Sequence, residues 1–213
     1  MTQTTFIWDL ADYNTSRTLF GRTVDTAIRR IRAIPVRTTD PEGEVVPLVL
    51  RKRETTAVRG RPLTMDGKLF TVPMRSTRQE LAQLHRIEQQ CRTFVMNNRR
   101  EIGIPDLKPS RVFVAFRDDD RTVVLKYHSD SCKSYDADGD EIDLAVVTQS
   151  FRVDHTFSIP RLLVFQDTVV IDCVAVECAI SDVGWLEREE IQSMRKAIAE
   201  TVVTKGAKRR RRN

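Results

Sequence analysis

The sequence predicts an α+β fold whose body is a mostly antiparallel β-barrel or sandwich, with one inserted helix and one C-terminal helix. Three observations predict this class. Short β-prone runs are separated by turn-forming clusters, apolar stripes at helical spacing occur in only two places, and strands and helices do not alternate regularly. A doubly wound parallel sheet requires regular alternation, so the pattern argues against that architecture.

The length and composition are typical of one globular domain. The chain has 213 residues, of which 40% are hydrophobic and 31% are charged, and this length allows a full core without metals or disulfides. We expect a single domain over residues 1–204 and a disordered basic tail over residues 205–213. The apolar runs are too short to span a bilayer, and the N-terminus lacks the features of a secretory signal. These features predict a nuclear or cytoplasmic protein that is not secreted and keeps its four cysteines reduced.

Charge is distributed unevenly along the chain. Residues 1–78 contain 14 Lys or Arg and 8 Asp or Glu, a net charge of +6. Residues 79–204 contain 15 Lys or Arg and 22 Asp or Glu, a net charge of −7. Residues 205–213 contain 6 Lys or Arg and no Asp or Glu, a net charge of +6. The whole chain carries +5, and the chain without its last nine residues carries −1. A basic first third and a basic tail predict a polyanionic partner for part of the surface.

The first third is expected to consist of paired strands. Residues 27–37 set isoleucines and a valine among arginines, and Pro35 argues against a helix, so we expect one long bent strand here. A turn at residues 38–44 and a partner strand at 45–53 are expected to follow it. A second hairpin is expected at 61–74, with Asp66-Gly67 at its turn. Because the first two strands are predicted to form a hairpin, their basic residues are expected to lie near one another.

The middle and end of the chain contain two predicted helices and five further strands. The apolar stripe at 77–100 recurs every three to four residues, with Ser76 or Thr77 as the N-cap. A second helix is expected over residues 185–203. The strands are expected at residues 111–116, 122–128, 141–147, 155–165 and 169–180, with turns at 117–121 and 136–140, and the last two strands form a hairpin.

Two parts of the sequence resemble metal sites, but neither has the full ligand pattern that a metal site needs. The segment SYDADGDEIDLA (134–145) resembles a calcium loop, but it places Ala145 where a bidentate glutamate is needed, and its flanks are strand-like. His128, Asp130 and Cys132 alternate along one segment, and His155 could join them around zinc, yet no second ligand pair has a suitable spacing. We expect no metal and no cofactor.

The sequence has no motif that identifies an enzyme. It contains no glycine-rich phosphate loop and no spacing typical of a hydrolase or metalloprotease. A cysteine–histidine nucleophilic pair has no support from spacing either. We therefore expect a protein that is not an enzyme.

The basic clusters are the strongest functional signal. Exposed Lys and Arg bind phosphates through counterion release, and exposed rings stack on bases. A tyrosine beside a lysine is a better stacking candidate than a phenylalanine in a strand, which more often belongs to the core. The predicted nucleic-acid-binding residues are Arg29, Arg30, Arg32, Arg51, Lys52, Arg53, Arg59, Arg61, Lys126, Tyr127, Lys133 and Tyr135. The tail residues Lys208, Arg209, Arg210, Arg211 and Arg212 are predicted to act as a nuclear-localisation signal or as a nucleic-acid contact.

The arrangement resembles the oligonucleotide-binding (OB) fold proteins that coat single-stranded DNA in large DNA viruses and phages. The resemblance rests on the predicted strand IRRIRAIPVR with its partner VVPLVLRKR, the inserted helix, and the closing hairpin IPRLLVFQDTVVIDCVAVECAI. It covers roughly residues 20–180 and implies an OB-like barrel whose strand face and loops hold single strands. Replicative members of such families often end in an acidic tail, whereas this chain ends in four arginines and an asparagine.

These observations predict a non-enzymatic single-stranded DNA-binding protein that acts in viral DNA replication or recombination. Its predicted partners are single-stranded nucleic acid and, through the tail, an import receptor; it is not expected to bind membranes, and it could form homo-oligomers. A virion or capsid protein whose basic tail contacts packaged nucleic acid is the alternative. A nuclear module that binds only protein is a third and weaker reading.

Overall fold

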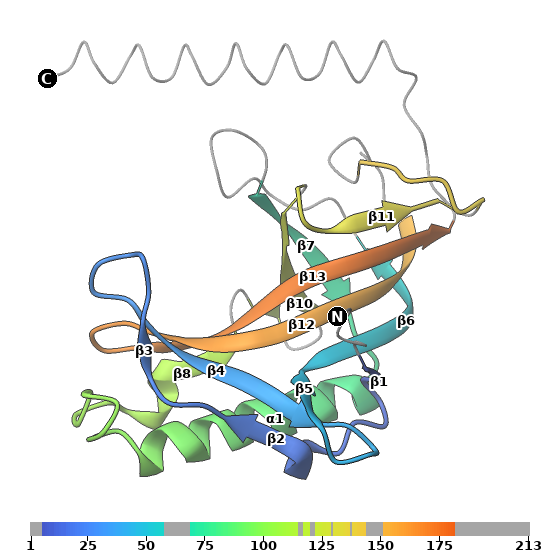
Figure 1. Ribbon diagram of the computed structural model, residues 1–213. Helices are drawn as coiled ribbons and strands as arrows, with labels where there is room; N and C mark the ends of the chain where they lie inside the picture. The colour runs from blue at the N-terminus through green and yellow to red at the C-terminus, as the bar shows by residue number, and fades with distance from the viewer. Residues whose placement is uncertain are drawn as a thin grey trace, which may run out of the picture.

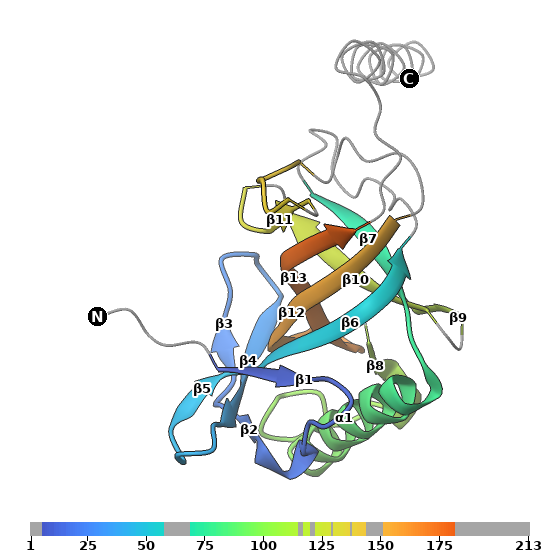
Figure 2. The same cartoon turned by 90° about the vertical axis from the view of Figure 1, so that its right-hand side faces the viewer.

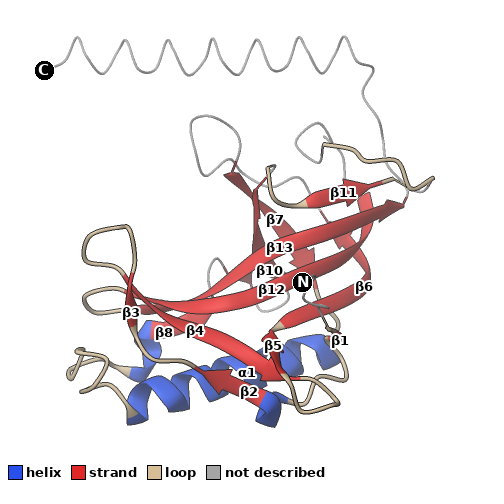
Figure 3. Ribbon diagram, in the orientation of Figure 1, coloured by secondary structure: helices blue, strands red, loops and turns tan. Residues whose placement is uncertain are grey.

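The computed structural model describes residues 6–57, 69–114, 117–119, 122–128, 130–136, 138–143 and 151–181. The expected hairpin turn at Asp66-Gly67, the C-terminal helix over 185–203 and the basic tail lie outside these residues, as does most of the strand expected at 141–147. One α-helix, α1 (Arg78–Asn97), packs against a mostly antiparallel sheet, which confirms the α+β class (Figures 1 and 3). Two short 3₁₀ turns, η1 (Thr15–Arg17) and η2 (Pro109–Arg111), lie in the connections.

The described strands form one sheet. They are β1 (Ile7–Asp9), β2 (Thr18–Phe20), β3 (Val24–Asp25), β4 (Arg32–Thr39), β5 (Val45–Pro47), β6 (Val49–Ala57), β7 (Leu69–Arg75), β8 (Val112–Val114), β9 (Arg117–Asp119), β10 (Thr122–His128), β11 (Lys133–Tyr135), β12 (Phe151–Val164) and β13 (Val169–Ser181). The main path of pairing runs β1-β6-β7-β10-β13-β12-β4-β2, and β6 pairs with β12 as well. Among the described pairings, only β1–β6, β10–β13, β11–β13 and β8–β13 are parallel.

The hairpin of β12 and β13 is the longest pairing in the sheet and confirms the prediction from the sequence. The two strands cross the molecule side by side (Figures 1 and 2). A register shift in β12 falls between Ser158 and Arg161, where Pro160 lacks the amide that a ladder requires. This shift divides β12 into a first part that pairs with β6 and a second part that pairs with β4.

The helix also follows the prediction, with shorter bounds. Thr77 is the N-cap: its side chain accepts a hydrogen bond from the Glu80 amide, while the Glu80 side chain accepts one from the Thr77 amide. This reciprocal capping box fixes the first residue of the helix. The helix ends at Asn97, and residues 98–104 form a tight turn around Gly103, whose φ is +77°. Glycine adopts this left-handed conformation at little cost, so it suits the close of the turn.

Two expectations for the strands are wrong. Residues 27–31 belong to the β3–β4 turn, because the Ile31 amide bonds to the Ile28 carbonyl and closes a local turn before β4 begins at Arg32. Residues 117–121 were expected to be a turn, but Arg117–Asp119 is the short strand β9 and pairs with β10. The short strands β1 and β2 were not predicted, since three residues carry too little periodicity to detect.

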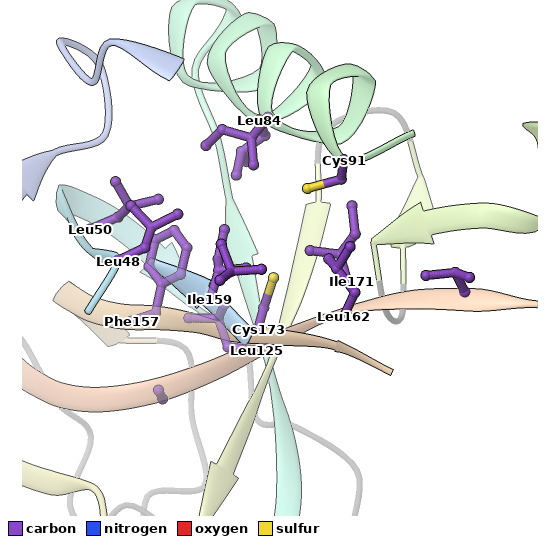
Figure 4. Close-up of a cluster of buried hydrophobic side chains, with 14 of the residues drawn as sticks. Leu48, Leu50, Leu84, Cys91, Leu125, Phe157, Ile159, Leu162, Ile171 and Cys173 are labelled. Atoms are coloured by element: carbon purple, nitrogen blue, oxygen red, sulfur yellow. The ribbon is translucent and has the colours of Figure 1, made fainter. Parts of the chain in front are cut away.

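The core lies between α1 and the sheet. Figure 4 shows Leu84 and Cys91 of α1 directed towards Phe157, Ile159 and Cys173 of the sheet. All five side chains are at most 1% exposed, so the helix stripe predicted from the sequence is the surface that packs on the strands. Within the part of the chain that the structure describes, no helix has the length and apolar character needed to cross a membrane.

Candidate nucleic-acid interface

The turn between β3 and β4 presents two arginines to solvent. Thr26 fastens this turn: its hydroxyl donates to the carbonyls of Ile28 and Ile31, at 3.1 and 2.7 Å. Arg29 and Arg30 lie at the tip and are exposed, and Arg30 has a left-handed backbone with φ 71°. The two guanidinium groups are therefore carried on a short turn that is hydrogen-bonded at its base.

Arg32, the first residue of β4, connects this turn to the segment after α1. A Cβ added to Gly103 would lie 2.9 Å from Nη1 of Arg32, so the guanidinium rests directly against the glycine. The guanidinium is the end of a flexible side chain that can move aside, so it is the positive φ of Gly103 that favours glycine here. The contact places the Arg32 side chain beside the 98–104 turn.

Two further arginines, Arg99 and Arg100, come from this second turn, and the sequence-based prediction missed them. Both are exposed. Their carbonyls accept hydrogen bonds from the Ile104 and Gly103 amides, respectively, which fixes the local backbone. The signal that could have found them is a basic pair in the turn that follows the helical pattern, before Gly103. We call the set Arg29, Arg30, Arg32, Arg99 and Arg100 the basic end.

The arginines of the basic end make no ion pairs with carboxylates among the described residues. Other arginines do: Arg53 pairs with Asp9, Arg111 with Asp167, and Arg161 with Asp172. Acidic residues also occur nearby, namely Asp25, Glu101, Asp106 and Asp167. The basic end therefore combines five arginines from segments far apart in sequence, and it leaves their guanidinium donors available to an external anion.

An aromatic ring lies on the same end of the sheet. Phe113 of β8 is 39% exposed and stands opposite Val170 of β13, which stands opposite Leu163 of β12 and then Ala33 of β4. Residues directly opposite one another in a sheet share a face. Phe113 thus shares a face with Ala33, while Arg32, the next residue on β4, points to the opposite face of the sheet. Although a phenylalanine in a strand more often belongs to the core, this one is partly open to solvent.

The arginines predicted on the second strand lie elsewhere. After Pro47 the chain leaves β4, and the Leu48 carbonyl accepts a bond from the Ile159 amide of β12. Strand β12 then lies between β4 and β6, with Arg32 opposite Val164 and Arg51 opposite Thr156. Eight residues along one strand correspond to about 26 Å. The expected closeness of the two basic clusters is therefore wrong. Arg51 is half-buried, and Arg53 is exposed beside Asp9.

Lys52 is a buried ion-pair partner, which corrects its assignment to a surface. Its Nζ lies 2.6 Å from Oε2 of Glu80, and its side chain is 2% exposed. Although burial acts to raise it, the pKa of Glu80 is lowered by hydrogen bonds from Lys52 and Thr77. Lys52 joins β6 to the first turn of α1, so it is not available to a ligand.

Lys126 and Tyr127 are not part of the interface either. Nζ of Lys126 lies 2.6 Å from Oδ1 of Asp172, a carboxylate that Arg161 contacts as well. Tyr127 is 1% exposed, and its hydroxyl shares a hydrogen bond with Ser134. A ring buried in the core cannot stack on a base. Leu125 and Tyr127, two residues apart, lie on the face of β10 that is buried.

Lys133 and Tyr135 stand on β11, far from the basic end. Lys133 is exposed and Tyr135 is half-buried. Strand β11 pairs with residues 177–179 of β13, whereas the basic end lies beside the start of that strand (Figure 1). Arg59, Arg61 and the tail residues Lys208, Arg209, Arg210, Arg211 and Arg212 lie outside the described residues.

One cysteine and one histidine do meet, in the core. Sγ of Cys178 lies 3.5 Å from Nδ1 of His155, and both side chains are fully buried. A hydrogen bond with Cys132 and burial raise the pKa of the Cys178 thiol. Burial, with the nearby Lys52 charge, lowers the pKa of His155 to about 3. A protonated thiol that solvent cannot reach is a poor nucleophile, so the pair supports a structural role.

The acidic turn at 136–140 satisfies its own hydrogen bonds. Oδ1 of Asp136 accepts from the amides of Asp138 and Asp140, at 3.0 and 2.9 Å. Gly139 takes the left-handed conformation that closes the turn. The carboxylate thus acts as a turn cap. A search of the described residues for three or more clustered His, Cys, Asp or Glu side chains suitable for a metal found none.

Comparison with known proteins gives no relative. No family model and no curated protein sequence matches this chain.

Proposed function

We propose that the chain is a non-enzymatic single-stranded nucleic-acid-binding protein built on an OB-like arrangement of five strands. The observation that carries this proposal is the path of pairing through β6, β7, β10, β13 and β12, and back to β6. If β6, β7, β10, β12 and β13 are numbered 1 to 5 along the chain, the order of pairing is 1-2-3-5-4-1. We infer that this order is the path of a small, partly open Greek-key barrel of the kind that binds oligonucleotides.

The directions and lengths of the strand pairings are consistent with this arrangement. The third and fifth strands, β10 and β13, pair in parallel at Lys126 and Val174, and every other pairing on this path is antiparallel. Among the described residues, β6 and β7 pair only at Ala57 and Met74. These two short pairings fit a barrel that is only partly closed. By the resemblance noted for the sequence, the proposed role is in viral DNA replication or recombination.

Charge and burial support a binding role. Arginines without an ion pair among the described residues gather at one end of the sheet, where they can neutralise phosphates and release the counterions of a nucleic acid. The cysteine and histidine that approach one another are enclosed in the core, where they cannot reach a substrate.

A titration of the full-length protein against a short fluorescent oligothymidylate tests the proposal. We expect binding at low salt, with the logarithm of the association constant falling linearly with the logarithm of the salt concentration. A duplex of matched length serves as the control, and we expect it to bind more weakly because its bases are not free to stack. Absence of oligonucleotide binding at low salt, from a protein that is folded by circular dichroism, would contradict the proposal. Assembly into large particles without oligonucleotide would favour a capsid role.

A further inference from the structure

We propose that the basic end and Phe113 together form the surface that holds the single strand, with the arginines binding phosphates and the ring stacking on a base. This inference rests on the proposed function and specifies where on the molecule it is performed. The site consists of Arg29, Arg30, Arg32, Arg99, Arg100 and Phe113.

The surface is assembled from segments that the fold brings to one end. In Figure 1 the β3–β4 turn, the β12–β13 turn and the segment after α1 lie at the same side of the molecule. Contacts establish that they are neighbours: Arg32 rests on Gly103 and pairs in register with Val164, while Arg111 contacts Asp167 at 3.6 Å. The site therefore extends around the end of the sheet, from the face that carries Arg32 to the opposite face, which carries Phe113.

The spacing suits an extended strand of nucleic acid. Arg32, Val164, Val169 and Val112 stand side by side on four adjacent strands, β4, β12, β13 and β8. Neighbouring strands lie about 4.8 Å apart, so Arg32 and the residue before Phe113 are separated by about 14 Å. Because Phe113 points to the face opposite Arg32, a bound strand passes around the end of the sheet, with phosphates at the arginines and an unstacked base at the ring.

The exposed apolar residues near this end favour nucleic acid over a simple anion. Ile28 is 64% exposed at the tip of the β3–β4 turn, and Val24 of β3 is 48% exposed. Val24 stands opposite Ala33 and so belongs to the same cross-strand row as Phe113. Inorganic phosphate has no apolar part to place there, whereas the bases of a single strand do. Lys108, which is exposed, lies just before β8 and extends the positive charge towards the ring, whereas Arg111 beside it pairs with Asp167.

The arginine part of the proposal is tested by the variant R29Q/R30Q/R99Q/R100Q in the full-length chain. Each lost phosphate contact removes about 0.7 from the log–log salt slope on a single strand, so the slope should fall by up to about 2.8. The matched control is R37Q/R78Q, which removes two exposed arginines elsewhere; Arg78 begins α1, about 30 Å of helix away from Arg99. A double variant, R99Q/R100Q, matches the charge change of this control and should lower the slope by about 1.4.

The ring is tested separately, because stacking does not depend on salt in the same way. Phe113→Ala should weaken binding about tenfold, within the range of stacking on one base, and leave the salt slope unchanged. Phe113→Tyr keeps the ring and should bind as the parent does. Circular dichroism and melting confirm that each variant is folded.

The outcomes separate this inference from the proposed function. If the parent binds oligothymidylate but R99Q/R100Q and R37Q/R78Q lower the slope equally, the basic end is not the binding surface, although the function stands. If Phe113→Ala and Phe113→Tyr bind as the parent does, the ring takes no part. If the parent fails to bind at all, the proposed function itself is wrong.

Discussion

At the scale of single residues, the buried polar side chains separate core from interface. His155 stands opposite Lys52 in the pairing of β12 with β6 and contacts Cys178. Its Nε2 is buried and has no hydrogen-bond partner in the part of the chain that the structure describes. A neutral imidazole tolerates this environment better than an imidazolium, which would be desolvated beside a buried cation.

His155 is therefore expected to make folding sensitive to acid. Because its folded pKa is lowered to about 3 from 6.5, the unfolded state binds the proton first as the pH falls. Stability is fully present above pH 6.5 and decreases by about 1.4 kcal/mol per pH unit from there towards the folded pKa. Urea unfolding at a series of pH values measures this slope. His155→Leu should lower the slope of the free energy of unfolding against pH by the contribution of one proton. An identical slope in both proteins would show that the side chain is not buried as a neutral group.

At the scale of elements, one ion pair attaches the helix to the sheet. Glu80 is both the capping-box residue of α1 and the partner of buried Lys52 on β6. The same carboxylate thus fixes where the helix begins and where its first turn docks. Burying a charge is costly unless its partner is present, so the two residues depend on each other.

Removal of one member of this pair should destabilise the protein strongly. Glu80→Gln leaves Lys52 buried without an anion, and we expect a loss of about 3 kcal/mol in the free energy of unfolding. Lys52→Met combined with Glu80→Gln should recover most of that loss. Because the folded pKa of Glu80 is lowered, the contribution of the pair is present above the ordinary carboxyl pKa and is lost as the pH falls through the lowered value.

Denaturant unfolding at neutral pH measures these differences, and an exposed ion pair provides the control. Asp167 and Arg111 are more than half exposed and lie 3.6 Å apart. Asp167→Asn should therefore change the stability by less than about 1 kcal/mol. Equal effects of Glu80→Gln and Asp167→Asn would mean that burial of the pair does not contribute as argued.

At the scale of the whole molecule, charge is divided between a body and a tail. The last nine residues carry six positive charges, and the remainder carries −1. The basic end nevertheless gives the body a locally positive surface, and the field at a surface depends on local charge placement. The proposed binding surface and the tail can therefore act separately.

Deletion of residues 205–213 tests this separation. We expect the truncated protein to bind oligothymidylate nearly as well as the parent in solution, because the arginines of the basic end remain. In a eukaryotic cell, fused to a large fluorescent reporter, the truncated protein should stay in the cytoplasm while the parent enters the nucleus. Loss of oligonucleotide binding on deletion would show instead that the tail is the main contact.

The parts of the fold that could be predicted from sequence are those with local causes. The stripe of α1, its cap at Thr77 and the hairpin of β12 and β13 follow from periodicity and turn chemistry within a few residues. The bounds of β4 could not be predicted, because arginines beside isoleucines fit a turn as well as a strand. The hydrogen bonds of Thr26 and Ile31 decide between them.

By itself, the sequence determined that basic residues gather in the first third and that a helix interrupts a β-rich chain. Only the tertiary structure decided which charges reach solvent. Strand β12 pairs with both β4 and β6, so Lys52 is directed into the core while Arg29 and Arg30 remain outside. The turn after α1 brings Arg99 and Arg100 to the same end of the molecule, because Gly103 in that turn lies beside Arg32. The physical reason is that burial and charge clustering depend on long-range strand order, which no local pattern of residues encodes.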